Sequence, residues 1–202
     1  MYIPPYYKEE NEQILIEFME AHSFANLIST SNSKILATHL PFVIEKRAKG
    51  LVLVSHMAKA NPQWETFTAN DVLVIFQGPH AYISPTNYEK QQNVPTWNYI
   101  AVHASGKARI ISEPGEVMNL MEKTINNFEK QFYEQWKSLP PEYVNGMLKA
   151  IVAFEIEVTE LAGKFKLSQN KTKNEQLHII DSLGKSDDSA EKEISKEMKK
   201  KL

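Results

Sequence analysis

Two short segments of this chain carry residue types that suit ligand binding better than scaffold. Residues 56–64 read HMAKANPQW, and residues 163–170 read GKFKLSQN. Each mixes cations, amides and hydroxyls with small or apolar residues, and neither repeats with the period of a strand or a helix. A pocket for an anionic, aromatic ligand needs such a mixture, because it needs donors for a phosphate and apolar surface for a ring. We therefore expect both segments to contribute to such a pocket.

Lys59 is the first candidate, because it follows a predicted strand end and precedes a predicted helix start. Free backbone N–H groups collect at such a junction, and an anion binds there readily. Ser55 and His56 lie just before it, and Asn61 is placed to cap a short helix that begins at Pro62. A solvated surface lysine beside a capping histidine is the competing interpretation, and the local pattern favours the two about equally.

The second segment offers two further lysines. Alternation places Lys164, Lys166 and Ser168 on one face of a strand. An ordinary half-exposed strand shows the same alternation, and it is favoured where nothing else supports a site. The polar character continues through Gln169 and Asn170, which argues for a binding role.

Aromatic and histidine side chains are the remaining candidates. Trp97, Tyr99 and Tyr82 are suited to stacking on a flat ring, and equally to lining a dimer interface. His39 lies in an otherwise apolar strand, where a lone histidine is more often structural than functional. The six histidines show no metal-binding spacing such as HExxH, so the sequence predicts no metal site. It also contains no glycine-rich phosphate loop, GxSxG or paired-carboxylate motif, and no residue is singled out as catalytic.

Short strands dominate the elements that must position these residues. We expect strands at 24–30, 35–45, 50–56, 72–78, 80–84, 97–112 and 151–161, with a final hairpin or bent strand over 162–169. Helices are expected at 9–22, 114–136 and 140–148. Many short strands with few helices predict a mainly β protein with peripheral helices (α+β), built as a small closed or partly closed barrel. The helix at 114–136 must then pack on the outside of the barrel.

Composition bounds the class of protein. The chain has 202 residues, a net charge of −2 and a pI of about 6.3, which gives no electrostatic reason to expect nucleic-acid binding. It has no cysteine, which excludes disulfides and thiolate metal sites. The N-terminus has no signal-peptide core and no apolar run approaches the ~18 residues of a membrane span, so we expect a cytoplasmic protein. We expect one domain over 1–184 and a charged, solvent-exposed tail over 185–202.

Five dense motifs follow one another along the chain: ATHLPF (37–42), HMAKANPQW (56–64), FQGPHAYISP (76–85), VPTWNY (94–99) and GKFKLSQN (163–170). Together and in this order, they resemble the PaiB family of FMN-binding negative transcriptional regulators. The resemblance runs from MYIPPYY at the start to about residue 184. It implies the FMN-binding split β-barrel fold, FMN as cofactor, and a homodimer with flavin at the subunit interface.

The resemblance also implies roles for particular residues. Ser55, His56 and Lys59 would approach the flavin phosphate. Gln77 would lie near the ring, and Trp97 near the pocket or the partner subunit. The full set of cofactor-binding residues that we expect is Thr38, His39, Ser55, His56, Lys59, Asn61, Gln77, Trp97, Lys164 and Lys166.

The family name implies negative regulation of protease synthesis and sporulation. A second hypothesis is a flavin-dependent oxidoreductase that uses transiently bound NAD(P)H, since the chain has no Rossmann fingerprint. A third is a repressor that contacts DNA directly. The net charge and the lack of a recognisable helix-turn-helix disfavour this third hypothesis.

Overall fold

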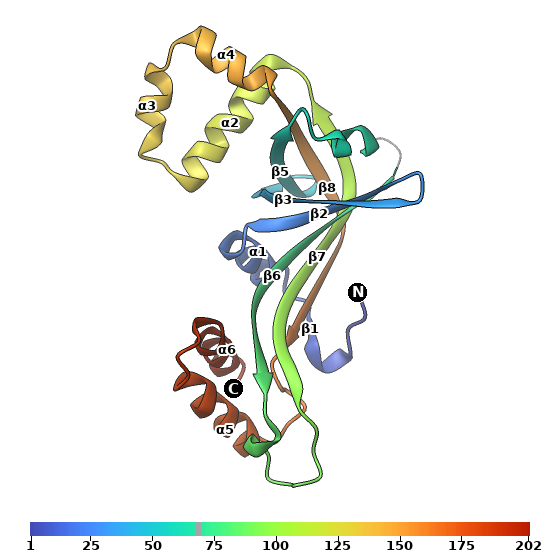
Figure 1. Cartoon of the computed structure of the whole chain (residues 1–202), viewed down its shortest axis with the longest axis vertical. Coiled ribbons are helices and arrows are strands. Elements are labelled where there is room, and N and C mark those ends of the chain that lie inside the picture. The colour runs from blue at the N-terminus through green and yellow to red at the C-terminus, as the bar shows by residue number, and fades with distance from the viewer. Residues whose placement is uncertain (68–69) are drawn as a thin grey trace. The chain divides into compact units, whose positions relative to one another are not determined.

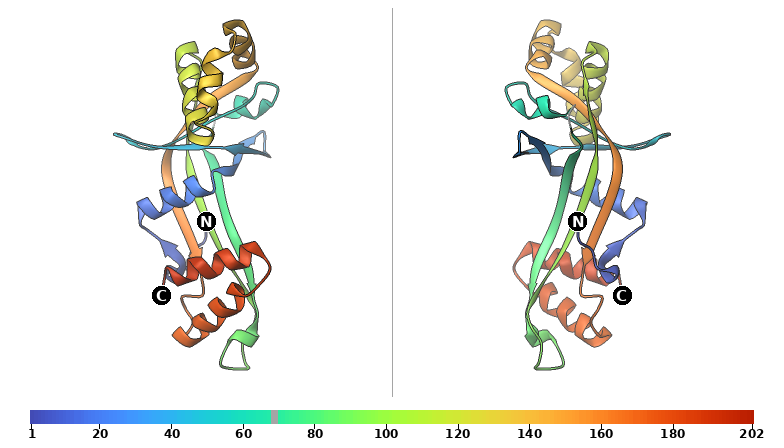
Figure 2. Two further views of the ribbon diagram at one scale, coloured as in Figure 1. Left: turned by 90° about the vertical axis from the view of Figure 1, so that its left-hand side faces the viewer. Right: turned by 90° about the vertical axis from the view of Figure 1, so that its right-hand side faces the viewer.

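The computed structural model describes residues 1–67 and 70–202 (Figures 1 and 2). The chain divides into two compact units. The first unit comprises Met1–Phe18, Gln77–Val102 and Ala162–Leu202, and the second comprises Met19–Phe76 and His103–Leu161. Within the described residues, no helix is long and apolar enough to cross a membrane.

Eight strands form one sheet, as Figure 1 shows. They are β1 (Lys8–Glu9), β2 (Phe24–Ser31), β3 (Lys34–Pro41), β4 (Val43–Arg47), β5 (Gly50–Ala58), β6 (Val72–Ile83), β7 (Thr96–Ile111) and β8 (Ile151–Lys166). The helices are α1 (Glu12–Ala21), α2 (Pro114–Phe128), α3 (Phe132–Ser138), α4 (Pro141–Lys149), α5 (Lys173–Gly184) and α6 (Ser189–Lys199). Three short 3₁₀ helices are η1 (Pro5–Tyr7), η2 (Pro62–Thr66) and η3 (Pro85–Asn87). The prediction of a mainly β protein with peripheral helices is confirmed.

The sequence predicts a single strand over 35–45, but the structure divides this stretch into β3 and β4. The sheet is open between these two strands. Its order is β3-β2-β6-β7-β8-β5-β4, with β1 added beside β8, so β3 and β4 are its two edges among the described residues. The chain passes from one edge to the other at Phe42, which lies between the two strands and donates its N–H to Ser23 at 2.9 Å. Pro41 has no N–H to donate and ends β3 at this corner. A covalent corner, and not a ladder of hydrogen bonds, therefore joins the two edges.

Aromatic side chains fill the core of the second unit. The ring of Phe42 packs edge-on against Phe76 at 5.9 Å and against Phe154 at 6.4 Å. Phe67 approaches Phe154 at 4.9 Å. All four rings are buried, and they come from the corner, β6, β8 and the turn after η2. Their contacts hold the strands of this unit around one apolar interior.

Helix 114–136 is predicted as one element, but the structure divides it into α2 and α3 after Phe128. Only Leu120 of α2 is buried, and it packs with Val117 and Met121 against apolar residues of β4 and β5. The apolar stripe of α2 therefore covers the sheet, as expected. The stripe does not continue into α3, which has no buried residue.

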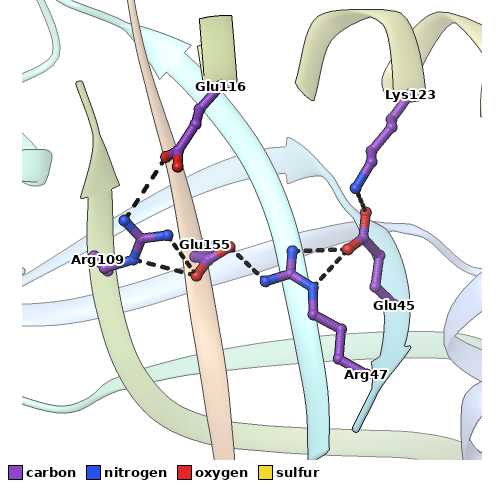
Figure 3. Close-up of polar contacts among 6 residues, drawn as sticks. All are labelled: Glu45, Arg47, Arg109, Glu116, Lys123 and Glu155. Carbon is purple, nitrogen blue, oxygen red and sulfur yellow. Dashed lines mark hydrogen bonds and ion pairs between the residues drawn. The ribbon is translucent and has the colours of Figure 1, made fainter. Parts of the chain in front are cut away.

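Charged side chains also tie α2 to the sheet (Figure 3). Glu155 on β8 is buried and accepts from Arg47 at 2.8 Å and from Arg109 at 2.9 Å. Burial alone would raise the pKa of Glu155, but the hydrogen bonds from Arg47 and Arg109 outweigh it and lower that pKa. From α2, Lys123 reaches Glu45 at 2.8 Å. This network keeps Glu155 ionised and fixes one end of α2.

In the first unit, the apolar face of the sheet is covered by helices. Phe18 of α1 packs on Phe165 of β8 with ring centroids 5.6 Å apart. Helices α5 and α6 lie side by side (Figure 2), and a capping box formed by Thr172 and Glu175 starts α5.

The C-terminal tail, which the sequence predicts to be solvent-exposed, is partly buried in the structure. Its helix α6 buries Ile194 and Met198, and the hydroxyl of Ser195 donates to the Ile180 carbonyl at 2.7 Å. Ile194 and Met198 are four residues apart, so they share one helix face and pack inward as a pair.

Candidate functional site

A cavity of about 770 Å³ lies in the second unit beside Lys59. Its walls come from the end of β7, the start of β8, α2, α4 and the segment from Lys59 to Trp64. Most lining side chains are apolar, including Ile111, Val117 and Leu148. The cavity therefore offers a large apolar surface next to a small number of polar groups.

Lysines supply the charge of this cavity. Lys59 and Lys149 both line it, and no aspartate or glutamate is among the described residues that do so. In the part of the chain that the structure describes, neither lysine forms an ion pair. The cavity thus has an unbalanced positive charge, which favours an anionic ligand.

Two backbone hydrogen bonds fix Lys59. Its N–H donates to the carbonyl of Ala150 at 2.8 Å, and its carbonyl accepts from the indole nitrogen of Trp64 at 3.1 Å. The side chain remains exposed. A backbone held by two hydrogen bonds therefore presents an exposed ammonium group at the cavity.

Hydrogen bonds occupy several backbone N–H groups at this junction, where the sequence predicts free ones. The N–H of Asn61 donates to Ala58 at 2.9 Å, and the N–H of Gln63 donates to the Asn61 side chain at 3.0 Å. Asn61 caps η2 as expected, and by doing so it occupies the donor that an anion would need. The N–H groups of Lys59, Asn61 and Gln63 are therefore not available to an anion, and the lysine side chains supply positive charge at this junction.

Gln63 organises the residues around this junction, although the sequence did not single it out. It is buried, and its amide accepts from the Thr38 hydroxyl at 2.5 Å and donates to the Leu27 carbonyl at 3.1 Å. The Asn61 amide donates to the same Thr38 hydroxyl at 2.9 Å. Thr38 and Asn61 therefore hold the HMAKANPQW segment against β2 and β3. Only the position of Gln63 inside that segment pointed to it.

The other expected residues of this unit do not line the cavity. Ser55 is buried and its hydroxyl donates to the Pro41 carbonyl at 2.7 Å, so it supports the corner between β3 and β4. His56 is half-buried, and that burial lowers its pKa. His39 is exposed and stacks on Phe24, with ring centroids 6.5 Å apart.

Four expected residues belong to the first unit. Gln77 is exposed, and Trp97 lies 5.8 Å from the rings of both His80 and Tyr82. The ammonium of Lys166 donates to the Trp97 carbonyl at 2.7 Å and to the hydroxyl of Thr96. Lys164 lies over the ring of Tyr99 at 5.2 Å. Trp97, Lys164 and Lys166 thus form a cluster of their own within this unit.

Lys149 is the cavity lysine that the sequence did not identify. It occupies the last turn of α4, in a run of exposed residues. A lysine at a helix C-terminus is ordinary, because it interacts favourably with the helix dipole. Only the fold shows that it shares a cavity with Lys59.

Known proteins are similar to this chain in sequence, and others are similar to it in fold. A family model described as "Putative FMN-binding domain" matches residues 1–160. A Bacillus subtilis protein named "Protease synthase and sporulation protein PAI 2" is 38% identical over 205 residues, covering 100% of this chain and 98% of that protein. An uncharacterized protein of Emericella nidulans is 31% identical, covering 89% of each chain.

Two solved structures have the same fold at low sequence identity. The flavocytochrome Anf3 of Azotobacter vinelandii matches with a TM-score of 0.64 and 14% identity, over 81% of this chain and 72% of that one. A FAD and heme binding protein of Mycobacterium smegmatis matches with a TM-score of 0.64 and 12% identity, over 85% and 78% of the two chains. These matches confirm the predicted split-barrel fold.

Proposed function

The chain belongs to the PaiB family, and from this premise we propose that it binds FMN and negatively regulates protease synthesis and sporulation. The name of the Bacillus subtilis relative supports the regulatory part, because the similarity extends over almost the whole of both chains. The description of the matching family model supports the cofactor. The proposed cellular location is the cytoplasm.

The cavity beside Lys59 is the observation that carries the FMN proposal. Its volume of about 770 Å³ is within the roughly 300–1,000 Å³ of small-molecule pockets. The apolar walls suit the isoalloxazine ring, and the indole of Trp64 is available for contact with it. Lys59 and Lys149 suit the phosphate, while Ser112 and Asn145 offer hydrogen-bonding groups for the ribityl hydroxyls.

The expected site residues of this unit then divide into two roles. Lys59 is proposed to contact the phosphate directly. Thr38 and Asn61 are proposed to act through Gln63, by holding the segment that carries Lys59. This division explains why the segment is rich in amides and hydroxyls although the cavity itself is mostly apolar.

A homodimer with flavin at its interface is the proposed assembly. Tyr143 and Met147 support it, because both are exposed on α4, the helix that also contributes Asn145 and Leu148 to the cavity. A second copy that covered these side chains would remove exposed apolar surface from water, and aromatic residues and methionine are enriched in protein interfaces.

Spectroscopy of the purified protein tests the cofactor. A bound flavin gives visible absorption, and FMN added to the unloaded protein should bind with loss of flavin fluorescence. No binding at high micromolar FMN would refute the proposal.

Genetics tests the regulatory role. Loss of the protein should raise extracellular protease activity and spore yield, and the intact gene should restore both to their original level. Unchanged protease activity and sporulation after deletion would contradict a negative regulator.

A further inference from the structure

The sheet of the first unit has one face covered by helices and one that the N-terminal segment contacts. On this second face the ammonium of Lys164 donates to the Tyr2 carbonyl at 3.3 Å, and the ring of Tyr7 lies 6.0 Å from the ammonium of Lys166. Along β6, β7 and β8 the side chains alternate, and the buried ones include Ala81, Asn98 and Phe165. The intervening residues point the other way. They form the cation–aromatic face, which consists of His80, Tyr82, Trp97, Tyr99, Lys164 and Lys166.

Positive charge is concentrated on this face, and among the described residues only one of its lysines, Lys8, has a carboxylate partner. Lys8 and Lys164 are directly opposite in the β1–β8 register, so two cations share one position of the sheet. Like charges placed this way destabilise a strand pair. Lys8 pairs with Glu10 at 2.5 Å, but neither Lys164 nor Lys166 forms an ion pair in the described part of the chain.

Lys166 is held in place although its charge is not neutralised. Its ammonium donates to the Trp97 carbonyl at 2.7 Å and to the Thr96 hydroxyl, which leaves one donor free. Burial and then the neighbouring charge of Lys164 lower the pKa of Lys166. An anion bound between the two lysines would remove this repulsion, so the face is prepared for a negative group.

Exposed aromatic rings stand beside these cations. Trp97 is 52% exposed and Tyr82 is 47% exposed. Their centroids are 5.8 Å apart and their planes meet at 73°, and the ring of His80 lies at the same distance from Trp97. The ammonium of Lys166 bonds to the main-chain carbonyl of Trp97, so the cation lies beside the backbone of this residue.

We propose that the cation–aromatic face binds a nucleoside phosphate, with the phosphate between Lys164 and Lys166 and the base stacked on Trp97. This site lies in the first unit and shares no residue with the cavity proposed for FMN. A second copy of the chain is a less suitable occupant, because a two-fold contact would bury the same unpaired lysines from both copies.

Titration of the full-length protein with AMP tests the site. AMP should bind at millimolar or lower concentration and quench tryptophan fluorescence, and a Trp97→Phe variant should lose that quenching. Adenosine, which lacks the phosphate, should bind about tenfold or more weakly, since each lost charge-assisted contact costs that much. No AMP binding, or equal binding of AMP and adenosine, would overturn the proposal.

Charge variants measured by calorimetry locate the phosphate. Lys164→Gln and Lys166→Gln should each weaken AMP about tenfold, and Lys166→Arg should restore most of the affinity. Lys173→Gln is the matched control, because Lys173 is an exposed lysine of the same unit that lies on α5, away from this face. If Lys166→Gln does not fold, Lys164→Gln decides. Wild-type affinity in the lysine variants would refute the assignment.

Two further measurements distinguish a nucleotide site on this face from the FMN cavity and from an interface between copies. Lys59→Ala should weaken the binding of FMN and leave the binding of AMP unchanged. Lys164→Gln should weaken the binding of AMP and leave the binding of FMN unchanged. Each of the two binding proposals can therefore be refuted independently of the other. Sedimentation of Lys164→Gln should give the wild-type oligomeric state. Loss of association together with no AMP binding would show instead that the face joins two copies of the chain.

Discussion

The indole nitrogen of Trp64 donates to the main-chain carbonyl of Lys59 at 3.1 Å. Both residues line the same cavity, and the N–H of Lys59 donates in turn to the carbonyl of Ala150, which lies between α4 and β8. A single hydrogen bond therefore holds the indole of Trp64, which lines the cavity, to the main chain of Lys59, which is proposed to contact the phosphate. This relationship links the local structure of the HMAKANPQW segment to its proposed function.

Replacing Trp64 by phenylalanine keeps a ring in the cavity and removes that bond. We expect FMN affinity to fall about 2- to 10-fold, which corresponds to one hydrogen bond. Flavin fluorescence titration measures the change. Trp136→Phe is the control, because Trp136 lies on α3 outside the cavity. Equal affinities in the two variants would show that the Trp64 bond does not organise the site.

Gln63 should contribute strongly to the free energy of unfolding, although it lies in a short 3₁₀ helix. A Gln63→Ala variant removes the bond to the buried Leu27 carbonyl and the acceptor of the half-buried Thr38 hydroxyl, which keeps only its bond from Asn61. We expect the free energy of unfolding in urea to fall by about 2–4 kcal/mol. Glu65→Ala, an exposed change in the same 3₁₀ helix, should alter it by less than about 0.5 kcal/mol. A small effect at Gln63 would contradict the network.

Gly106 should not tolerate even alanine. A Cβ at this position would lie 2.0 Å from the main-chain oxygen of Glu157, so β7 and β8 would have to separate. We expect Gly106→Ala to lower the free energy of unfolding by about 1–3 kcal/mol or more. At Gly146 in α4 a Cβ meets nothing within 4 Å, so Gly146→Ala should be neutral or stabilise by roughly 0.5–1 kcal/mol. The same response at both positions would argue against this close approach.

His56 should make the fold sensitive to mild acid. Burial lowers its pKa, so the unfolded chain binds a proton at a pH where the folded chain does not. The free energy of unfolding should therefore fall as the pH drops below the ordinary histidine range of about 6.5, until the folded pKa is reached. His56→Gln should lose this part of the pH dependence. Identical pH profiles of the two proteins between neutral and mildly acidic pH would refute it.

The sequence predicted the fold class well, because alternation and motif order are local properties. The strand before Lys59 was expected from an apolar run, and the strand that carries Lys164 was expected from alternation. The division at Phe42 was missed, because an apolar residue after a proline fits a continuous strand as well as a corner. The burial of Ile194 and Met198 was also missed. A charged helix with few apolar residues is predicted to be solvent-exposed as long as the helix that packs against it is not known.

The site was predicted less completely than the fold. Lys59 was identified from its place at a strand end, and the structure puts it in a cavity. Lys149 was missed, because it is distant in the sequence and ordinary in its local pattern. The sequence also indicates an anion site made by backbone N–H groups at this junction, but the capping side chain of Asn61 accepts from one of them. A contact between two segments that are distant in the sequence cannot be predicted from the residue pattern of either segment alone.

Comparison of FMN with riboflavin tests the central claim most directly, because the two ligands differ only in the phosphate. The wild-type protein should bind FMN about tenfold or more tightly than riboflavin, as expected for charge-assisted contacts to a phosphate. Lys59→Ala should weaken FMN by a similar factor and leave riboflavin unchanged, so that the preference largely disappears. A wild-type preference retained in Lys59→Ala, or equal affinity of the wild type for both ligands, would contradict a phosphate site at Lys59.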